Sequence, residues 1–128
     1  LSDVRLQLVI PEKSDQFLVG SAAKAYFDVL LDMGVEIYLF QDDILHSKTM
    51  SIDYNLAFLG TSNFDIRSFA LNFELNLVLY GTEETAAIRM IQEKYIAASR
   101  RLTREKWSER PRAIRMVHGI TKLFSPLL

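Results

Sequence analysis

The sequence has no cysteine and no long hydrophobic run, and each absence excludes a class of protein. Without cysteine the chain can form neither disulfide bonds nor thiolate metal sites. No uninterrupted apolar segment approaches the about 20 residues that a helix needs to cross a bilayer. The 128 residues, 49% hydrophobic and 24% charged, suit one globular domain rather than a disordered segment. Because the sequence begins at Leu1, we interpret it as a piece of a longer protein.

The net charge of −1 conceals an uneven distribution along the chain. From residue 100 to the end there are eight basic and two acidic residues, which gives this segment a charge of +6. The preceding residues carry seven basic and fourteen acidic side chains, a charge of −7. A basic end on an acidic body indicates a partner with negative charge, either an anionic lipid or a nucleic acid.

The first 40 residues have the pattern of a strand–helix–strand unit. Residues 4–10 predict a strand that ends at Pro11, and residues 35–40 predict a second strand. Between them, apolar residues recur at helical spacing up to Met33, and Gly34 is expected to end the helix. At these lengths the strands should pair in parallel, with the helix on one face of the sheet.

The middle of the chain predicts three further strands. They are expected over residues 45–52, 56–60 and 73–80, with a tight turn at residues 53–55 joining the first two. The last of these strands is apolar enough to be buried on both faces.

Two helices are expected after these strands. The acidic residues after Thr82, and Arg100 and Arg101, match the dipole of a helix over residues 82–102. A last helix should begin near Pro111. The predicted fold class is therefore α/β, with a mixed β-sheet flanked by helices.

His46 and Lys48 lie two residues apart on a predicted strand, so that both side chains leave the same face of the sheet. This spacing puts an imidazole beside a fixed positive charge. The segment of small residues from Gly60 to Asn63 lets backbone amides and the Asn63 side chain approach the same point. Such a set of groups indicates a phosphate site. Histidine can attack phosphorus, while lysine and asparagine stabilise the charge on the phosphoryl oxygens.

Each of these residues alone has a plainer explanation. A single histidine on a strand is more often structural than catalytic, and a single lysine is usually a solvated charge. The combination carries the prediction, because a Gly–Thr–x–Asn segment at this distance from a His–x–Lys pair is far less frequent by chance.

The complete pattern, H-x-K-x4-D followed by G-[ST]-x-N, resembles the signature of the phospholipase D superfamily. Family members commonly have serine after the glycine, and Thr61 keeps the hydroxyl. The resemblance implies that His46 forms a covalent phosphohistidine intermediate. It also implies that the lysine and the Gly–Thr–x–Asn segment bind the phosphate, and that Asp53 is mainly structural. The positions that fill the pattern are His46, Lys48, Asp53, Gly60, Thr61 and Asn63.

The family also places an acid on the following strand, where it orients the nucleophilic histidine. Glu74 stands where the resemblance puts this acid. A buried carboxylate bonded to the second imidazole nitrogen fixes the tautomer and stabilises the imidazolium. The alternative is that Glu74 is a charge at the edge of the strand.

Within the superfamily, several segments are similar to the bacterial cardiolipin synthases, and the similarity covers essentially the whole chain. It implies phosphatidyl transfer between two phosphatidylglycerol molecules at the cytoplasmic membrane, which forms cardiolipin and releases glycerol. No cofactor is expected, and the sequence has no ligand cluster for zinc or iron. The segments are residues 9–15, 63–69, 71–74 and 123–128.

The family builds its active site from two such motifs, whereas this sequence has one. The second histidine, His118, has no lysine two residues later, and we interpret it as a surface or interface residue. The expected partner is a second motif-bearing half, either upstream in the same polypeptide or in a homodimer. Residues 1–104 are expected to form one catalytic half domain that is incomplete at its N-terminus.

The tail, residues 105–128, predicts a basic amphipathic helix after Pro111. Such a helix can lie in a membrane interface with its cations toward anionic headgroups. Trp107 is expected at the level of the headgroups. The alternative is that the apolar stripe of this helix packs on the body of the enzyme.

Three alternatives to lipid transfer stay open. Phospholipase D-type nucleases use the same motif as homodimers on DNA, although the acidic body here disfavours nucleic acid. The chain can also be a catalytically incomplete fragment that binds membranes. Hydrolysis of the lipid to phosphatidic acid, a phosphodiesterase reaction, differs only in the acceptor, because water and a glycerol hydroxyl attack the same phosphohistidine.

Overall fold

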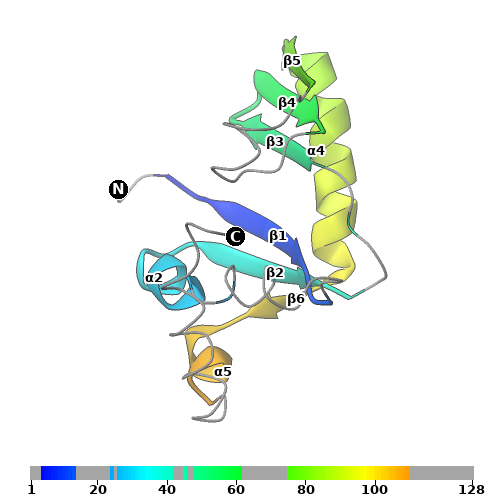
Figure 1. The fold of residues 1–128 in the computed structure, drawn as a ribbon. Coiled ribbons are helices and arrows are strands. Elements are labelled where there is room, and N and C mark those ends of the chain that lie inside the picture. The colour runs from blue at the N-terminus through cyan, green and yellow to red at the C-terminus, as the bar shows by residue number, and fades with distance from the viewer. Residues whose placement is uncertain are drawn as a thin grey trace. The chain divides into compact units, whose positions relative to one another are not determined.

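The described strands fall into two sheets of three, where the sequence predicted one sheet (Figure 1). The first compact unit consists of Leu1–Leu45 and Ala98–Leu128, and the second of His46–Ala97. No helix in the described part of the chain is long and apolar enough to cross a membrane. The computed structural model describes residues 4–13, 24, 26–41, 45, 48–61 and 75–109.

The sheet of the first unit is mixed. β2 (Glu36–Phe40) lies at its centre, parallel to β1 (Gln7–Pro11) and antiparallel to β6 (Ser99–Leu102). The helix α2 (Phe27–Asp32) lies between β1 and β2 in the chain. The parallel pairing confirms the predicted strand–helix–strand unit, and the antiparallel third strand confirms that the fold contains a mixed sheet.

Gly34 ends α2 as predicted. Its φ angle of +84° is one that a residue with a Cβ adopts only with strain. The Gly34 amide donates to the Leu31 carbonyl at 3.1 Å, and the Val35 amide donates to the Leu30 carbonyl at 3.0 Å. These two bonds satisfy carbonyls that the helix itself leaves unpaired. The sequence predicts that this helix begins at Ser14 and Asp15, which lie outside the described residues.

The core of the first unit lies on one face of this sheet. Ile37 is fully buried in β2, and Phe27 of α2 and Trp107 of α5 (Arg104–Ser108) belong to the same cluster. The two aromatic rings lie 5.1 Å apart at a tilt of 52°. The prediction that Trp107 lies among lipid headgroups is therefore wrong, because this ring is needed to fill the core beside Phe27.

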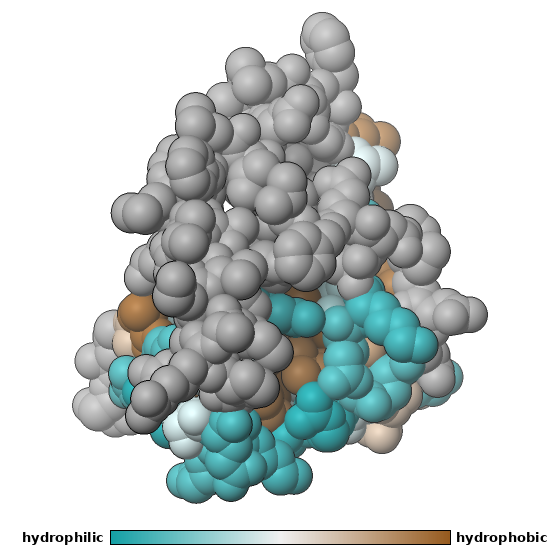
Figure 2. All heavy atoms as spheres, turned by 60° about the horizontal axis from the view of Figure 1, so that its bottom comes forward, coloured by the Kyte–Doolittle hydropathy of each residue, from teal (hydrophilic) through white to brown (hydrophobic). Residues whose placement is uncertain are grey.

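Burial, rather than ion pairing, holds α5 on α2. Arg104 pairs with Asp28 at 2.7 Å and with Asp32 at 3.2 Å. These side chains are largely exposed, and such pairs contribute about 1 kcal/mol or less each. Burial of one large apolar side chain contributes about 1.5–3 kcal/mol. In Figure 2, which turns the bottom of Figure 1 toward the viewer, most of the visible described surface there is hydrophilic, with smaller apolar areas between.

The predicted helix over residues 82–102 is shorter than expected. α4 (Thr82–Ala97) is helical, but Ser99–Leu102 forms β6, so Arg100 and Arg101 are not at a helix end. Helix propensities differ by less than about 0.7 kcal/mol per ordinary residue. Pairing with β2 outweighs such a difference, because it gives β2 a second partner and buries Leu102.

The second unit is an antiparallel sheet against which α4 packs (Figure 1). Its strands are β3 (Lys48–Ile52), β4 (Leu56–Gly60) and β5 (Asn76–Tyr80), in that order. The predicted tight turn between β3 and β4 is confirmed. Four of the five residues of β5 are exposed, so the prediction of a strand buried on both faces is wrong for them. Within the described residues β5 pairs only with β4 and is an edge strand.

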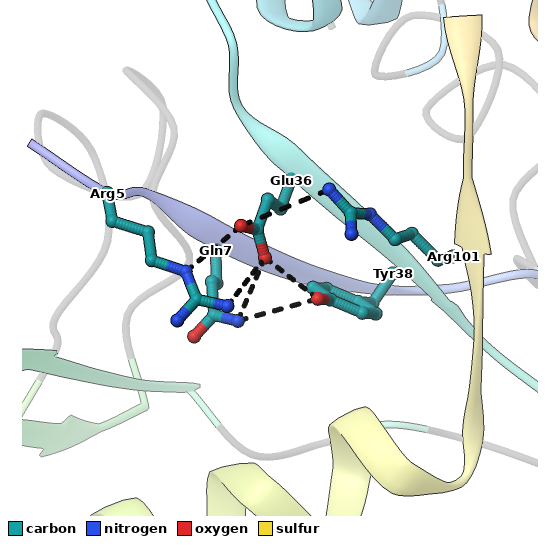
Figure 3. A network of polar contacts seen from close by, with 5 residues as sticks. All are labelled: Arg5, Gln7, Glu36, Tyr38 and Arg101. Atoms are coloured by element: carbon teal, nitrogen blue, oxygen red, sulfur yellow. Dashed lines mark hydrogen bonds and ion pairs between the residues drawn. The ribbon is translucent and has the colours of Figure 1, made fainter. Parts of the chain in front are cut away.

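Glu36 is the centre of a polar network on the sheet of the first unit (Figure 3). Arg5 donates to both of its carboxylate oxygens, at 3.0 and 3.2 Å. Tyr38 donates at 2.8 Å and Gln7 at 3.1 Å, and Arg101 lies 4.0 Å away. The hydrogen bond from Arg5 is the main reason that the pKa of Glu36 falls to about 2.

This low pKa predicts that the protein loses stability in acid. The unfolded carboxyl has its ordinary pKa of 4.5, so the unfolded state takes up a proton first as the pH falls. We expect the contribution of Glu36 to be complete above this pH and to disappear as the pH falls toward about 2. Chemical denaturation at a series of pH values should show a shallower decline for Glu36→Gln than for Glu93→Gln, an exposed control. Equal declines would contradict the network.

Candidate active site

The structure brings Lys48 and the Gly–Thr segment to the same end of one hairpin. Lys48 is the first residue of β3 and pairs with Gly60, the last residue of β4. Thr61 follows Gly60 directly. The strand register therefore puts two residues of the predicted phosphate site, Lys48 and Gly60, opposite each other.

Gly60 is required here because the backbone of β5 comes very close. A Cβ atom on Gly60 would lie 2.7 Å from the carbonyl oxygen of Leu75 and would overlap the side chain of Asn76. The side chain could rotate away, but the carbonyl belongs to the backbone that leads into β5. Any larger residue would therefore push β5 away from β4.

Thr61 holds the residue before β5 through two hydrogen bonds. Its amide donates to the Leu75 carbonyl at 3.0 Å, and its hydroxyl oxygen accepts from the Leu75 amide at 3.1 Å. These bonds continue the β4–β5 ladder by one residue. Leu75 directly follows Glu74 in the sequence, so Thr61 anchors the backbone next to the predicted orienting acid.

Asp53 lies at the opposite end of β3 from Lys48. It occupies the hairpin turn with a φ of 52°, which aspartate tolerates better than most residues. Its carbonyl accepts a hydrogen bond from Arg89 at 3.1 Å, and the guanidinium of Arg89 stands 4.5 Å from the ring centre of Tyr54. Five residue steps along a strand span about 16 Å, so Asp53 is separated from Lys48 by the length of β3.

Sequence reasoning missed the residues of α4 that contact β3. The Gln92 amide accepts a hydrogen bond from Ser51 at 2.7 Å and donates one to Thr49 at 3.2 Å. Arg89 lies one turn earlier on the same helix. Polar residues three apart on a helix share a face, but nothing in the sequence says which strand that face meets.

Several predicted residues lie outside the described part of the chain. They include the nucleophile His46, the amide Asn63, the acid Glu74, His118 and the amphipathic helix, all of which stay predictions. Among the residues that the structure does describe, no group of three or more His, Cys, Asp or Glu side chains can hold a metal ion.

The close approach at Gly60 predicts a cost for the smallest possible substitution. Gly60→Ala should lower the free energy of unfolding by about 1–3 kcal/mol, because β4 and β5 must separate. Amide hydrogen exchange in residues 76–80 should become faster. Gly34→Ala is the comparison, since an added Cβ there meets no atom within 4 Å. It should strain its own turn and leave exchange in β5 unchanged, and equal effects of both variants on β5 would contradict the steric explanation.

Comparison with known proteins shows the family to which the chain belongs. Residues 1–96 match the family described as "Cardiolipin synthase, PLD-like domain". The chain is 42% identical over 125 residues to Cardiolipin synthase A of Pectobacterium carotovorum and 41% identical to that of Salmonella arizonae. Each alignment covers 98% of this chain and 26% of the relative, so the chain spans about a quarter of their length. No solved structure matches it. The chain belongs to the phospholipase D-like domain family of the cardiolipin synthases.

Proposed function

We propose that this chain supplies one half of the active site of a phosphatidyltransferase that makes cardiolipin from two phosphatidylglycerol molecules. Its membership of the family supports this proposal. The structural observation that carries it is the pairing of Lys48 with Gly60. Because of that pairing, a lysine and a close-packed Gly–Thr segment lie at the same end of a hairpin. This lysine follows the predicted nucleophile His46 by two residues.

The proposed reaction has two displacements at phosphorus. An imidazole nitrogen of His46 attacks the phosphorus of one phosphatidylglycerol, and the bond to the terminal glycerol oxygen breaks. The second half of the site protonates the departing glycerol. The terminal hydroxyl of another phosphatidylglycerol then attacks the phosphohistidine and gives its proton back to that group. Cardiolipin leaves, and His46 is regenerated.

The remaining motif residues have supporting roles in this proposal. Lys48 and Asn63 stabilise negative charge on the phosphoryl oxygens as it develops, together with the amides of Gly60 and Thr61. Glu74 orients the imidazole of the nucleophile. Asp53 supports the hairpin, because its carbonyl is the acceptor for Arg89. No metal or cofactor takes part, since lysine and histidine supply the positive charge.

The proposed partners are anionic phospholipid, the surface of the bacterial cytoplasmic membrane and a second motif-bearing half. The relatives are about four times as long as this chain, so there is room in such a polypeptide for the second half. A homodimer would serve the same purpose. The charge of +6 after residue 99 favours a negatively charged membrane surface.

A lipid assay tests the proposed reaction. The enzyme assembled with its second half is incubated with phosphatidylglycerol vesicles, and the products are measured by mass spectrometry. We expect cardiolipin and glycerol in equal amounts, and a loss of about 10⁴-fold or more in His46→Ala, because the nucleophile is removed. Phosphatidic acid without cardiolipin would show hydrolysis instead. Cleavage of DNA that depends on His46 and weakens with salt would replace lipid transfer by nuclease activity.

A second test concerns contact of the tail with the membrane. Ile120→Asp combined with Phe124→Asp should weaken vesicle binding by about tenfold or more, because two apolar side chains can no longer enter the interface. Thr121→Asp with Ser125→Asp adds the same charge elsewhere on the tail and should have a smaller effect. Circular dichroism checks the fold, and vesicle sedimentation measures binding. Equal binding by all three proteins would contradict membrane contact of this stripe.

A further inference from the structure

We propose that Gln92 is a positioning residue that holds β3, the strand that begins with Lys48, against α4. This inference rests on the proposed function. Gln92 lies on α4 and contacts β3, and both elements belong to the second unit. Its side-chain carbonyl accepts from the Ser51 hydroxyl at 2.7 Å, and its side-chain NH2 donates to the Thr49 hydroxyl at 3.2 Å. One amide therefore uses its acceptor and its donor on two hydroxyls of the same strand.

The two hydroxyls lie on one face of β3. Thr49 and Ser51 are two residues apart, so their side chains leave the same face, and Lys48 leaves the other. Gln92 thus contacts the strand from the face opposite Lys48. A one-residue slip of β3 would exchange these faces and break both hydrogen bonds at once. The amide therefore opposes both a slip of the strand and its rotation about its own axis.

Arg89 makes the corresponding contact one helical turn earlier. It donates to the Asp53 carbonyl at 3.1 Å and lies over the Tyr54 ring at 4.5 Å. From Arg89 to Gln92 the contacts of α4 therefore move along β3 from its turn toward the end that carries Lys48. Gln92 makes the contact nearer to Lys48, and for this reason we assign the positioning role to it.

Gln92 acts through the strand and does not touch the substrate. A displacement of a reacting group by about 1 Å can lower a rate about 100-fold. Loss of the amide should therefore lower kcat by about 10- to 100-fold and change KM little, because the groups that recognise the lipid are still present.

Three variants of the enzyme assembled with both halves test this assignment. Gln92→Met keeps the length of the side chain, removes both hydrogen bonds and should show the full loss of kcat. Gln92→Glu should recover most of the rate, because its carboxylate can accept from both hydroxyls. Glu93→Met changes the neighbouring exposed position and should behave as the wild type. Full activity of Gln92→Met, or an equally low kcat in Gln92→Glu, would overturn the assignment.

A double-mutant cycle separates positioning from a general loss of stability. Thr49→Val with Ser51→Ala removes the partners of the amide and should reproduce the low kcat. Adding Gln92→Met to these changes should cost nothing further, since the interaction is already gone. Thermal unfolding shows whether each protein is folded at the assay temperature. Additive losses of kcat, or losses that follow the folded fraction, would contradict positioning.

A measurement without substrate distinguishes failure of this inference from failure of the proposed function. Amide hydrogen exchange over residues 48–52 should be at least about tenfold faster in Gln92→Met than in Glu93→Met. If the wild type makes no cardiolipin, this result still tests whether Gln92 holds β3. Equal exchange in the two variants would overturn the inference, whatever reaction the enzyme catalyses.

Discussion

The backbone leading into β5 comes so close to Gly60 that no side chain fits between them, and several positions in the candidate site follow from this contact. With Gly60 in place, Thr61 bonds to both polar backbone groups of Leu75. The register of β4 then puts Gly60 opposite Lys48 on its other side. One glycine therefore links three strands at the end of the hairpin where the proposed chemistry takes place.

The hydrogen bonds that hold the candidate site join residues far apart in the chain, and they differ in kind from those of the first unit. There, Glu36 gathers two arginines, a tyrosine and a glutamine on one sheet face, and the opposite face is packed with apolar side chains. In the second unit, a neutral amide and two neutral hydroxyls join α4 to β3, and the Arg89 guanidinium joins α4 to the turn between β3 and β4.

Features encoded by neighbouring residues were predictable from the sequence. Gly34 ends a helix because only glycine adopts its φ angle without strain, and this requirement is local. The turn at residues 53–55 was predicted for a similar reason. Signature residues such as Lys48 and Gly60 were identifiable because the pattern fixes their spacing, and β-pairing then brings them together.

Features that depend on distant partners were not predictable. The strand Ser99–Leu102 has the composition of a helix end, and only the free edge of β2 makes it a strand. Tryptophan is a residue type that is common at membrane interfaces, and only the space beside Phe27 makes Trp107 part of the core. The role of Gln92 depends on two hydroxyls more than 40 residues away in the chain.

The residues of the signature lie at two separate places in the structure, the end of the hairpin that carries Lys48 and the turn that contains Asp53. Lys48 and Gly60 lie at one end of the β3–β4 hairpin, and Asp53 lies at the turn, about 16 Å away by the rise of a strand. An acid at this distance cannot contact a phosphate held by the lysine. Its spacing from the lysine equals the length of β3, so this part of the pattern specifies the strand and its turn. Because Arg89 holds that turn from the same helix that presents Gln92, the fixed spacing also sets which residues of β3 meet α4.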